Sequence, residues 1–201
     1  MNRMVIASQN KHKIQEIKEI LQAFPFAIQS LDQVGLSHFH VEEDGETFEE
    51  NSMKKAREVM KATGSIALAD DSGLEVDVLD NQPGVYSARF SGEGATDKKN
   101  NQKLLVMLQD VPTEKRTARF VSVISVVFPD GKEVCVRGEC PGIIGFIEKG
   151  TNGFGYDPLF IVPEYQKTFG ELGSEVKNKI SHRARALSKL KDALQEVLGG
   201  I

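Results

Sequence analysis

The sequence predicts an α/β fold built on a mixed β-sheet flanked by helices. Strand and helix patterns alternate in the first half of the chain, two strand patterns joined by a turn signal follow, and a helix closes the chain. Alternation is typical of sheets covered by helices, and the joined strands add an antiparallel part. With 201 residues the chain can bury a substantial core, as one large domain or as two joined lobes.

The first strand and helix follow from apolar spacing. Residues 3–7 form a short apolar run typical of a strand, and residues 8–10 lead from it into a helix. Apolar residues then recur at helical spacing from Ile14 to Phe24, and Pro25 ends the pattern.

A second helix and two further strands are predicted next. Thr47 and Glu50 form a capping box at the start of the helix, and Gly64 is a typical helix stop. Residues 66–69 have the pattern of a buried strand, whereas residues 74–78 alternate apolar and polar side chains as a half-exposed strand does.

The second half of the chain contains a helix, a strand pair and the closing helix. The helix is predicted to begin near Thr96. Residues 119–128 are rich in β-formers, residues 129–131 are a Pro-Asp-Gly turn signal, and residues 133–139 form the partner strand. The last helix is predicted from residue 182 to 198, with apolar side chains along one face.

Composition restricts the classes of function. The formal net charge is −4 with no long run of one sign, which argues against binding to nucleic acid or to an anionic membrane. No stretch approaches the roughly 18 apolar residues that a membrane span needs, so we expect a soluble, cytoplasmic protein. Cys135 and Cys140 lack the further ligands of a zinc site, and we expect reduced thiols in or beside a strand.

Two adjacent carboxylates, Asp70 and Asp71, follow the strand at 66–69, and Ser72 and Gly73 then predict a tight turn. Ligands in α/β sheets bind at strand ends, and neighbouring like charges there need a cation or hydrogen bonds. Mg²⁺ is the natural cation because it prefers carboxylate and water oxygens. A surface turn without a ligand explains the same residues, so both interpretations stay open.

A second candidate is the segment SQNKHK at residues 8–13. The N-terminus of a helix attracts phosphate, and Lys11 and Lys13 add positive charge. An Asn10 N-cap with solvated lysines is the simpler interpretation of this segment alone.

The third candidate combines GTNGFGYDP at residues 150–158 with the helix start at His182 and Arg183. Phe154 and Tyr156 offer rings for stacking on a base, and the histidine and arginine offer hydrogen-bond donors to a carbonyl or phosphate. There is no Walker A motif, which excludes a P-loop enzyme. Together, the three candidates supply groups that can bind phosphate, a metal ion and a nucleobase, which indicates a nucleotide-binding site.

These motifs resemble those of the inosine triphosphate pyrophosphatase family, whose members act on non-standard purine nucleoside triphosphates. The shared patterns, in family order from Ser8 to Arg183, are S-x-N-x-x-K, E-x-G-x-T-F-x-E-N-x-x-x-K-A, A-D-D-S-G-L-x-V-D, P-G-x-Y-S-A-R-F-S-G, G-F-G-Y-D-P and S-H-R. They cover nearly the whole chain. The combination of the third, fifth and sixth is highly specific, whereas the first alone is weak.

The resemblance implies a fold and an activity. The fold would be an elongated mixed sheet flanked by helices, forming one domain over residues 1–201 with two lobes and a central cleft, usually as a homodimer. The activity would be hydrolysis of ITP, dITP and XTP to the monophosphate and pyrophosphate with Mg²⁺, which removes deaminated purines from the nucleotide pool.

The resemblance also implies roles for individual residues. Asp71 would be the catalytic carboxylate and a metal ligand, and Glu42 would share the metal, with adjacent Glu43 as the alternative. Gln9 stands where many members have glycine, which would alter the approach of that loop to phosphate but leaves Asn10 and Lys13 in place. The implied substrate-binding residues are Ser8, Gln9, Asn10, Lys11, His12, Lys13, Ser72, Phe154, Gly155, Tyr156, Asp157, Lys177, His182 and Arg183.

Three questions stay open at this point. Asp71 either accepts a proton from the attacking water or only holds the metal. The donor to the 6-carbonyl of the purine is either Arg183 or a backbone N–H, and no residue is assigned to the exclusion of guanine. A Maf-type nucleotide pyrophosphatase, which would lack GFGYDP and SHR, and a non-catalytic nucleotide sensor are the alternative functions.

Overall fold

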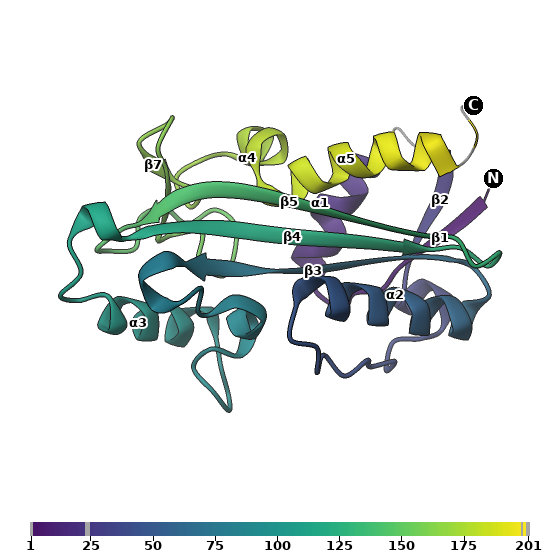
Figure 1. Ribbon diagram of the computed structural model, residues 1–201, viewed down its shortest axis with the longest axis horizontal. Helices are drawn as coiled ribbons and strands as arrows, with labels where there is room; N and C mark the ends of the chain where they lie inside the picture. The colour runs from purple at the N-terminus through teal and green to yellow at the C-terminus, as the bar shows by residue number, and fades with distance from the viewer. Residues whose placement is uncertain (1, 23–24, 198, 200–201) are drawn as a thin grey trace. The chain divides into compact units, whose positions relative to one another are not determined.

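A computed structural model describes residues 2–22, 25–197 and 199 of the chain (Figure 1). Its strands form one seven-stranded sheet in the order β2-β1-β3-β4-β5-β6-β7. β1 is parallel to β2 and β3, whereas β6 is antiparallel to β5 and β7, so the predicted mixed sheet with flanking helices is confirmed. The elements are β1 (Asn2–Ile6), α1 (Lys11–Leu21), β2 (Phe26–Ser30), α2 (Phe48–Thr63), β3 (Ile66–Val76), α3 (Asp97–Met107), β4 (Thr117–Val127), β5 (Glu133–Ile144), β6 (Phe160–Val162), β7 (Lys167–Thr168), α4 (Ser174–Ile180) and α5 (His182–Val197).

The chain divides into two compact units. The first consists of Met1–Asp71, Ser122–Gly138 and Arg183–Ile201, and the second of Ser72–Val121 and Glu139–His182. The first boundary therefore falls inside β3, directly after Asp71. The assignment of both units to a single domain with a central cleft stays a prediction.

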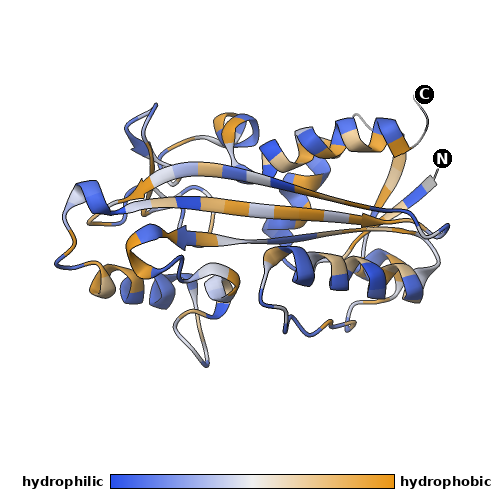
Figure 2. Ribbon diagram, viewed as in Figure 1, coloured by the Kyte–Doolittle hydropathy of each residue, from blue (hydrophilic) through white to orange (hydrophobic). Residues whose placement is uncertain are grey.

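In the first unit, α1 and α5 pack on one face of the strands and α2 packs on the other. Leu68 of β3 belongs to the core that includes α1 and α5, whereas Ala67 and Ala69 belong to the core that includes α2. Figure 2 shows hydrophilic residues on the outward turns of α2 and α5. Because side chains alternate along a strand, Asp70 continues the face of Leu68 and Asp71 the face of Ala69.

Most predicted elements are confirmed. The capping box of Thr47 and Glu50 is present at α2, Gly64 ends that helix in the left-handed conformation, and Thr96 caps α3. Pro25 lies beyond the end of α1, but Phe24 lies outside the described residues. The short strands β2, β6 and β7 and the helix α4 were not predicted.

Two strand predictions are wrong in detail. The tight turn at Ser72 and Gly73 is absent, because both residues continue β3 from Ile66 to Val76. A turn is unnecessary because cations neutralise Asp70 inside the fold, and β3 pairs within the sheet on both sides. Val78, predicted to be part of the half-exposed strand at residues 74–78, lies in a 3₁₀ turn and is exposed.

The remaining predictions concern β5 and membranes. β5 runs to Ile144, five residues beyond its predicted end, and contains both cysteines as free thiols, Cys135 exposed and Cys140 buried. Among the described residues, no helix is long and apolar enough to cross a membrane.

Candidate active site

Asp70 is the centre of a buried ion-pair network in the first unit. Its Oδ2 lies 3.0 Å from Lys13 Nζ and 3.2 Å from Arg183 Nη2, and Ser122 Oγ donates to its Oδ1. Arg183, itself buried, also pairs with Glu16 of α1. Burial alone would raise the pKa of Asp70, but the charges of Arg183 and Lys13 outweigh it and hold that pKa well below its usual range.

Asp71 lies on the opposite face of β3 and meets α2. Its Oδ1 is 3.2 Å from Nζ of Lys55, which also lies 2.7 Å from Glu43 Oε1 and donates to the backbone carbonyl of Asp70 at 3.0 Å. The other carboxylate oxygen, Oδ2, is buried and has no hydrogen-bond partner among the described residues. Burial raises the pKa of Asp71, while the positive charges of Lys55 and Lys13 oppose that rise.

The two adjacent carboxyl groups thus differ in their surroundings. Asp70 pairs with two cations and accepts a hydrogen bond from a hydroxyl group, so its charge stabilises the fold. Among the described residues, Asp71 forms one ion pair, with Lys55, and its Oδ2 has no hydrogen-bond partner. Neighbouring groups whose pKa values are driven apart are typical of catalytic sites. This difference favours Asp71 over Asp70 as the reacting carboxylate.

Lys55 is a site residue that was not predicted from the sequence. Burial alone would lower its pKa, but the charges of Asp71 and Glu43 raise it, so the ammonium group stays charged. Two signals could have found it. Lys55 lies between Ser52 and Val59 on the inward face of α2, where a lysine is unusual, and it is the lysine of the E-N-x-x-x-K-A pattern.

The donor set near Asp71 fits a magnesium ion. Asp71 Oδ2, which has no partner among the described residues, is a buried oxygen of the kind that Mg²⁺ binds. Glu43 forms an ion pair with the same Lys55 ammonium group as Asp71 does. Glu42, the predicted second ligand, is exposed. Within the described residues no cluster of three or more metal-ligating side chains occurs. Mg²⁺ usually needs none, because one or two carboxylates, waters and substrate phosphates complete its shell.

Residues 8–13 form the predicted junction between β1 and α1. Asn10 is the N-cap and accepts from the backbone N–H groups of His12 and Lys13, and the Ser8 hydroxyl accepts from the Asn10 N–H. Gln9, the departure from the family pattern, donates its side-chain amide to the carbonyls of Ser37 and Phe39. It therefore ties the loop to the chain after β2 and leaves Asn10 in its place as the N-cap. Lys11 is exposed.

In the second unit, Asp157 organises the glycine-rich loop. Its Oδ2 accepts from the Phe154 N–H at 2.9 Å and lies 2.7 Å from Lys177 Nζ of α4, whose ammonium is 4.8 Å from the centre of the Phe154 ring. Gly153 has φ of +77°, and a Cβ there would lie 1.9 Å from the same oxygen. The loop thus holds Phe154 half-buried with one ring face near a cation.

The remaining predicted residues of this unit are buried or half-buried. Tyr156 is 4% exposed and donates its hydroxyl to the Ser87 carbonyl at 2.8 Å, and burial raises its pKa. Its ring belongs to the core, which leaves Phe154 as the ring that could stack on a base. His182 stacks on Phe120 at 4.9 Å at the start of α5, and Ser72 is half-buried in β3.

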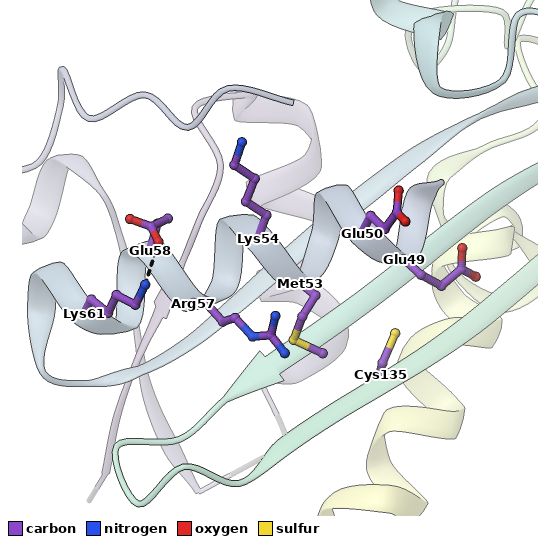
Figure 3. A pocket seen from close by; sticks show the side chains of 8 residues that line it. All are labelled: Glu49, Glu50, Met53, Lys54, Arg57, Glu58, Lys61 and Cys135. Carbon is purple, nitrogen blue, oxygen red and sulfur yellow. Dashed lines mark hydrogen bonds and ion pairs between the residues drawn. The ribbon is translucent and has the colours of Figure 1, made fainter. Parts of the chain in front are cut away.

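A groove of about 600 Å³ lies elsewhere in the first unit, across the outward side of α2 and β5 (Figure 3). Met53 and Cys135 form part of its wall, together with charged residues of α2. Charged groups of this wall pair with neighbours, as Lys61 does with Glu58 and Arg57 with Glu133. None of the predicted site residues lines this groove.

Comparisons with known proteins agree on one family. Residues 4–193 match the model of the Ham1 family. A dITP/XTP pyrophosphatase of Clostridium perfringens is 52% identical over 98% of this chain and all of the relative, and one of Geobacter sulfurreducens is 53% identical over 96% and 97%. Among solved structures, the HAM1 protein of Coxiella burnetii matches with a TM-score of 0.88 at 40% identity, covering 98% of this chain and 100% of that one. The Ham1 protein of Staphylococcus aureus matches with 0.87 at 42% identity, covering 96% and 98%.

Proposed function

This chain belongs to the Ham1 family, and on that premise we propose that it hydrolyses deaminated purine nucleoside triphosphates to the monophosphate and pyrophosphate. The substrates would be ITP, dITP and XTP, in line with the names of its relatives. One observation carries the proposal from this chain's own residues. Asp71 presents a buried carboxylate oxygen that has no partner in the described part of the chain, beside the charged Lys55, as a hydrolytic phosphate site requires.

Asp71 and Glu43 would hold the magnesium ion. Mg²⁺, when bound, would offset the negative charge of the phosphates and favour ionisation of a water. Glu43 is the better second ligand, because it shares Lys55 with Asp71, whereas Glu42 is exposed and adds to the charge around Lys54.

The side chains of the first unit would perform the hydrolytic step. Asp71 accepts the proton of the water that attacks the α-phosphorus, and pyrophosphate leaves. Lys55 fixes the Asp71 carboxylate through its Oδ1. Ser8 and Asn10 bind the phosphates at the start of α1, where the helix dipole favours negative charge, and Lys13 adds its positive charge there while it pairs with Asp70. Positioning and charge neutralisation carry most of the rate enhancement in such reactions.

The base would be bound by the glycine-rich loop of the second unit. Phe154 stacks on the purine, and Asp157 with Lys177 fixes the ring. Arg183 is engaged with Asp70 and Glu16, so we propose a backbone N–H as the donor to the 6-carbonyl and Arg183 as the residue that orients Asp70. Adenine has an amino group at position 6 and would leave that donor unpaired.

Pyrophosphate release from a panel of ITP, XTP, dITP, GTP, ATP and dTTP, with Mg²⁺ and with a chelator, tests the proposal. We expect fast, metal-dependent release from the three deaminated purines and little from the others. Release from dTTP would favour a Maf-type enzyme. Tight binding of ITP without any release would favour a nucleotide sensor.

Two further properties complete the proposal. We propose a cytoplasmic location, because the free nucleotide pool is there, and a homodimer. Sedimentation equilibrium tests the second property, and a single species at the mass of one 22.2 kDa chain over a wide concentration range would contradict it.

A further inference from the structure

The glycine-rich loop is held by helix α3 as well as by its own aspartate. Oδ2 of Asp97 accepts from the backbone N–H of Gly155 at 2.7 Å, and Nδ2 of Asn101 donates to the Gly155 carbonyl at 3.2 Å. Both residues belong to the second unit, as the loop does. Neither lies in a motif that the chain shares with the family or among the predicted site residues.

The geometry of α3 brings these two side chains to one residue. Thr96 caps the helix, so Asp97 is its first residue and Asn101 follows four residues later on the same face. Gly155 has φ of +62°, which favours glycine. Asn101 is buried, whereas Asp97 is exposed at the helix end.

Three consecutive peptide groups of the loop are therefore each fixed by a side chain. Asp157 accepts from the N–H of Phe154, Asp97 accepts from the N–H of Gly155, and Asn101 donates to the carbonyl of Gly155. The first two peptide groups flank the α-carbon of Phe154. Fixing both sets the direction in which its ring leaves the backbone, and hydrogen bonds to a carboxylate are the stronger kind.

We propose that Asp97 is a positioning residue for base recognition, which holds the Phe154 ring in the orientation that stacks on the purine. The inference rests on the proposed role of Phe154 as the base platform. Asp97 does not contact the phosphates or the reacting carboxylate in this assignment. Its loss should therefore weaken substrate binding and leave the chemical step almost unchanged.

Steady-state kinetics with ITP on four variants of the full chain test the proposal. Asp97→Ala removes the acceptor, Asp97→Asn keeps an acceptor oxygen without the charge, and Lys98→Ala is the matched control on the exposed side of the same turn. Phe154→Ala reports on the base platform itself. Thermal unfolding of each variant shows whether the fold is retained.

For Asp97→Ala we expect KM for ITP to rise about tenfold, as loss of one charge-assisted hydrogen bond implies, with kcat within about threefold of wild type. Asp97→Asn should recover part of the loss, because it keeps an acceptor oxygen without the charge, and Lys98→Ala should match wild type. If Phe154→Ala raises KM but Asp97→Ala does not, the positioning role is wrong. The same conclusion follows if Asp97→Asn is as impaired as Asp97→Ala, because the helix charge alone would then matter. If Phe154→Ala leaves KM unchanged, the base platform is wrong, and the inference fails with it.

Discussion

Replacing each of the two adjacent aspartates by asparagine should damage two different properties of the protein. Asp70 is buried and binds Lys13, Arg183 and Ser122. Removing one partner of a buried ion pair costs about 3–5 kcal/mol, because the other charge stays buried. Asparagine keeps the volume and one acceptor, so we expect a loss of about 3 kcal/mol. For a chain of this length that lowers the unfolding temperature by about 6–12 °C.

Asp71→Asn should leave the stability almost unchanged and remove most of the activity. Lys55 keeps Glu43 and the Asp70 carbonyl as partners, so we expect a change in stability within about 1 kcal/mol. Turnover should fall at least about 100-fold, because the proton acceptor and a metal ligand are lost together.

Thermal unfolding and pyrophosphate release from ITP at 25 °C, measured on both variants, separate the two roles. Asp70→Asn should retain turnover within about tenfold of wild type at this temperature. An Asp70→Asn protein as stable as wild type would refute the structural role of the network. Wild-type turnover in Asp71→Asn would remove Asp71 from the mechanism.

Three further variants test neighbouring features. Lys55→Met keeps the length of the side chain but leaves Asp71 without its cation, and we expect kcat for ITP to fall about 100-fold, with Lys54→Met, half-buried and paired with Asp44, as the control. Gly153→Ala forces a Cβ against a carboxylate oxygen of its own loop at positive φ, so KM for ITP should rise and the unfolding temperature should fall. Glu43→Gln should raise the Mg²⁺ concentration for half-maximal activity about tenfold, and an equal shift in Glu42→Gln would contradict the choice between them.

Local signals in the sequence were sufficient to place both ends of α2. The capping box of Thr47 and Glu50 and the stop at Gly64 depend on residues a few positions apart, and the structure confirms them. The prediction of a turn at Ser72 and Gly73 was wrong because non-local strand pairing decides the structure there. Local chemistry favours a turn there, but pairing with the neighbouring strands keeps β3 extended.

The candidate site was predictable in its residue types and only partly in its contacts. Asp71 was chosen over Asp70 by resemblance, since sequence alone gives adjacent carboxylates the same chemistry. The distinction comes from Arg183, 113 positions away, which pairs with Asp70. Lys55 and Asp97 were missed because lysine on a helix and aspartate after an N-cap are ordinary features until their partners are known.

The alternation of side chains along β3 explains why two adjacent acids occur at this point. A strand turns consecutive side chains to opposite faces, so Asp70 meets the cations of α1 and α5, and Asp71 meets Lys55 of α2. Asp70 closes the buried network on one face, which fixes the backbone at that position. The next residue is then held in place with an oxygen still free of protein partners among the described residues. A reacting carboxylate needs such a fixed backbone. Asp70 fixes the backbone next to Asp71 through its ion pairs with Lys13 of α1 and Arg183 of α5.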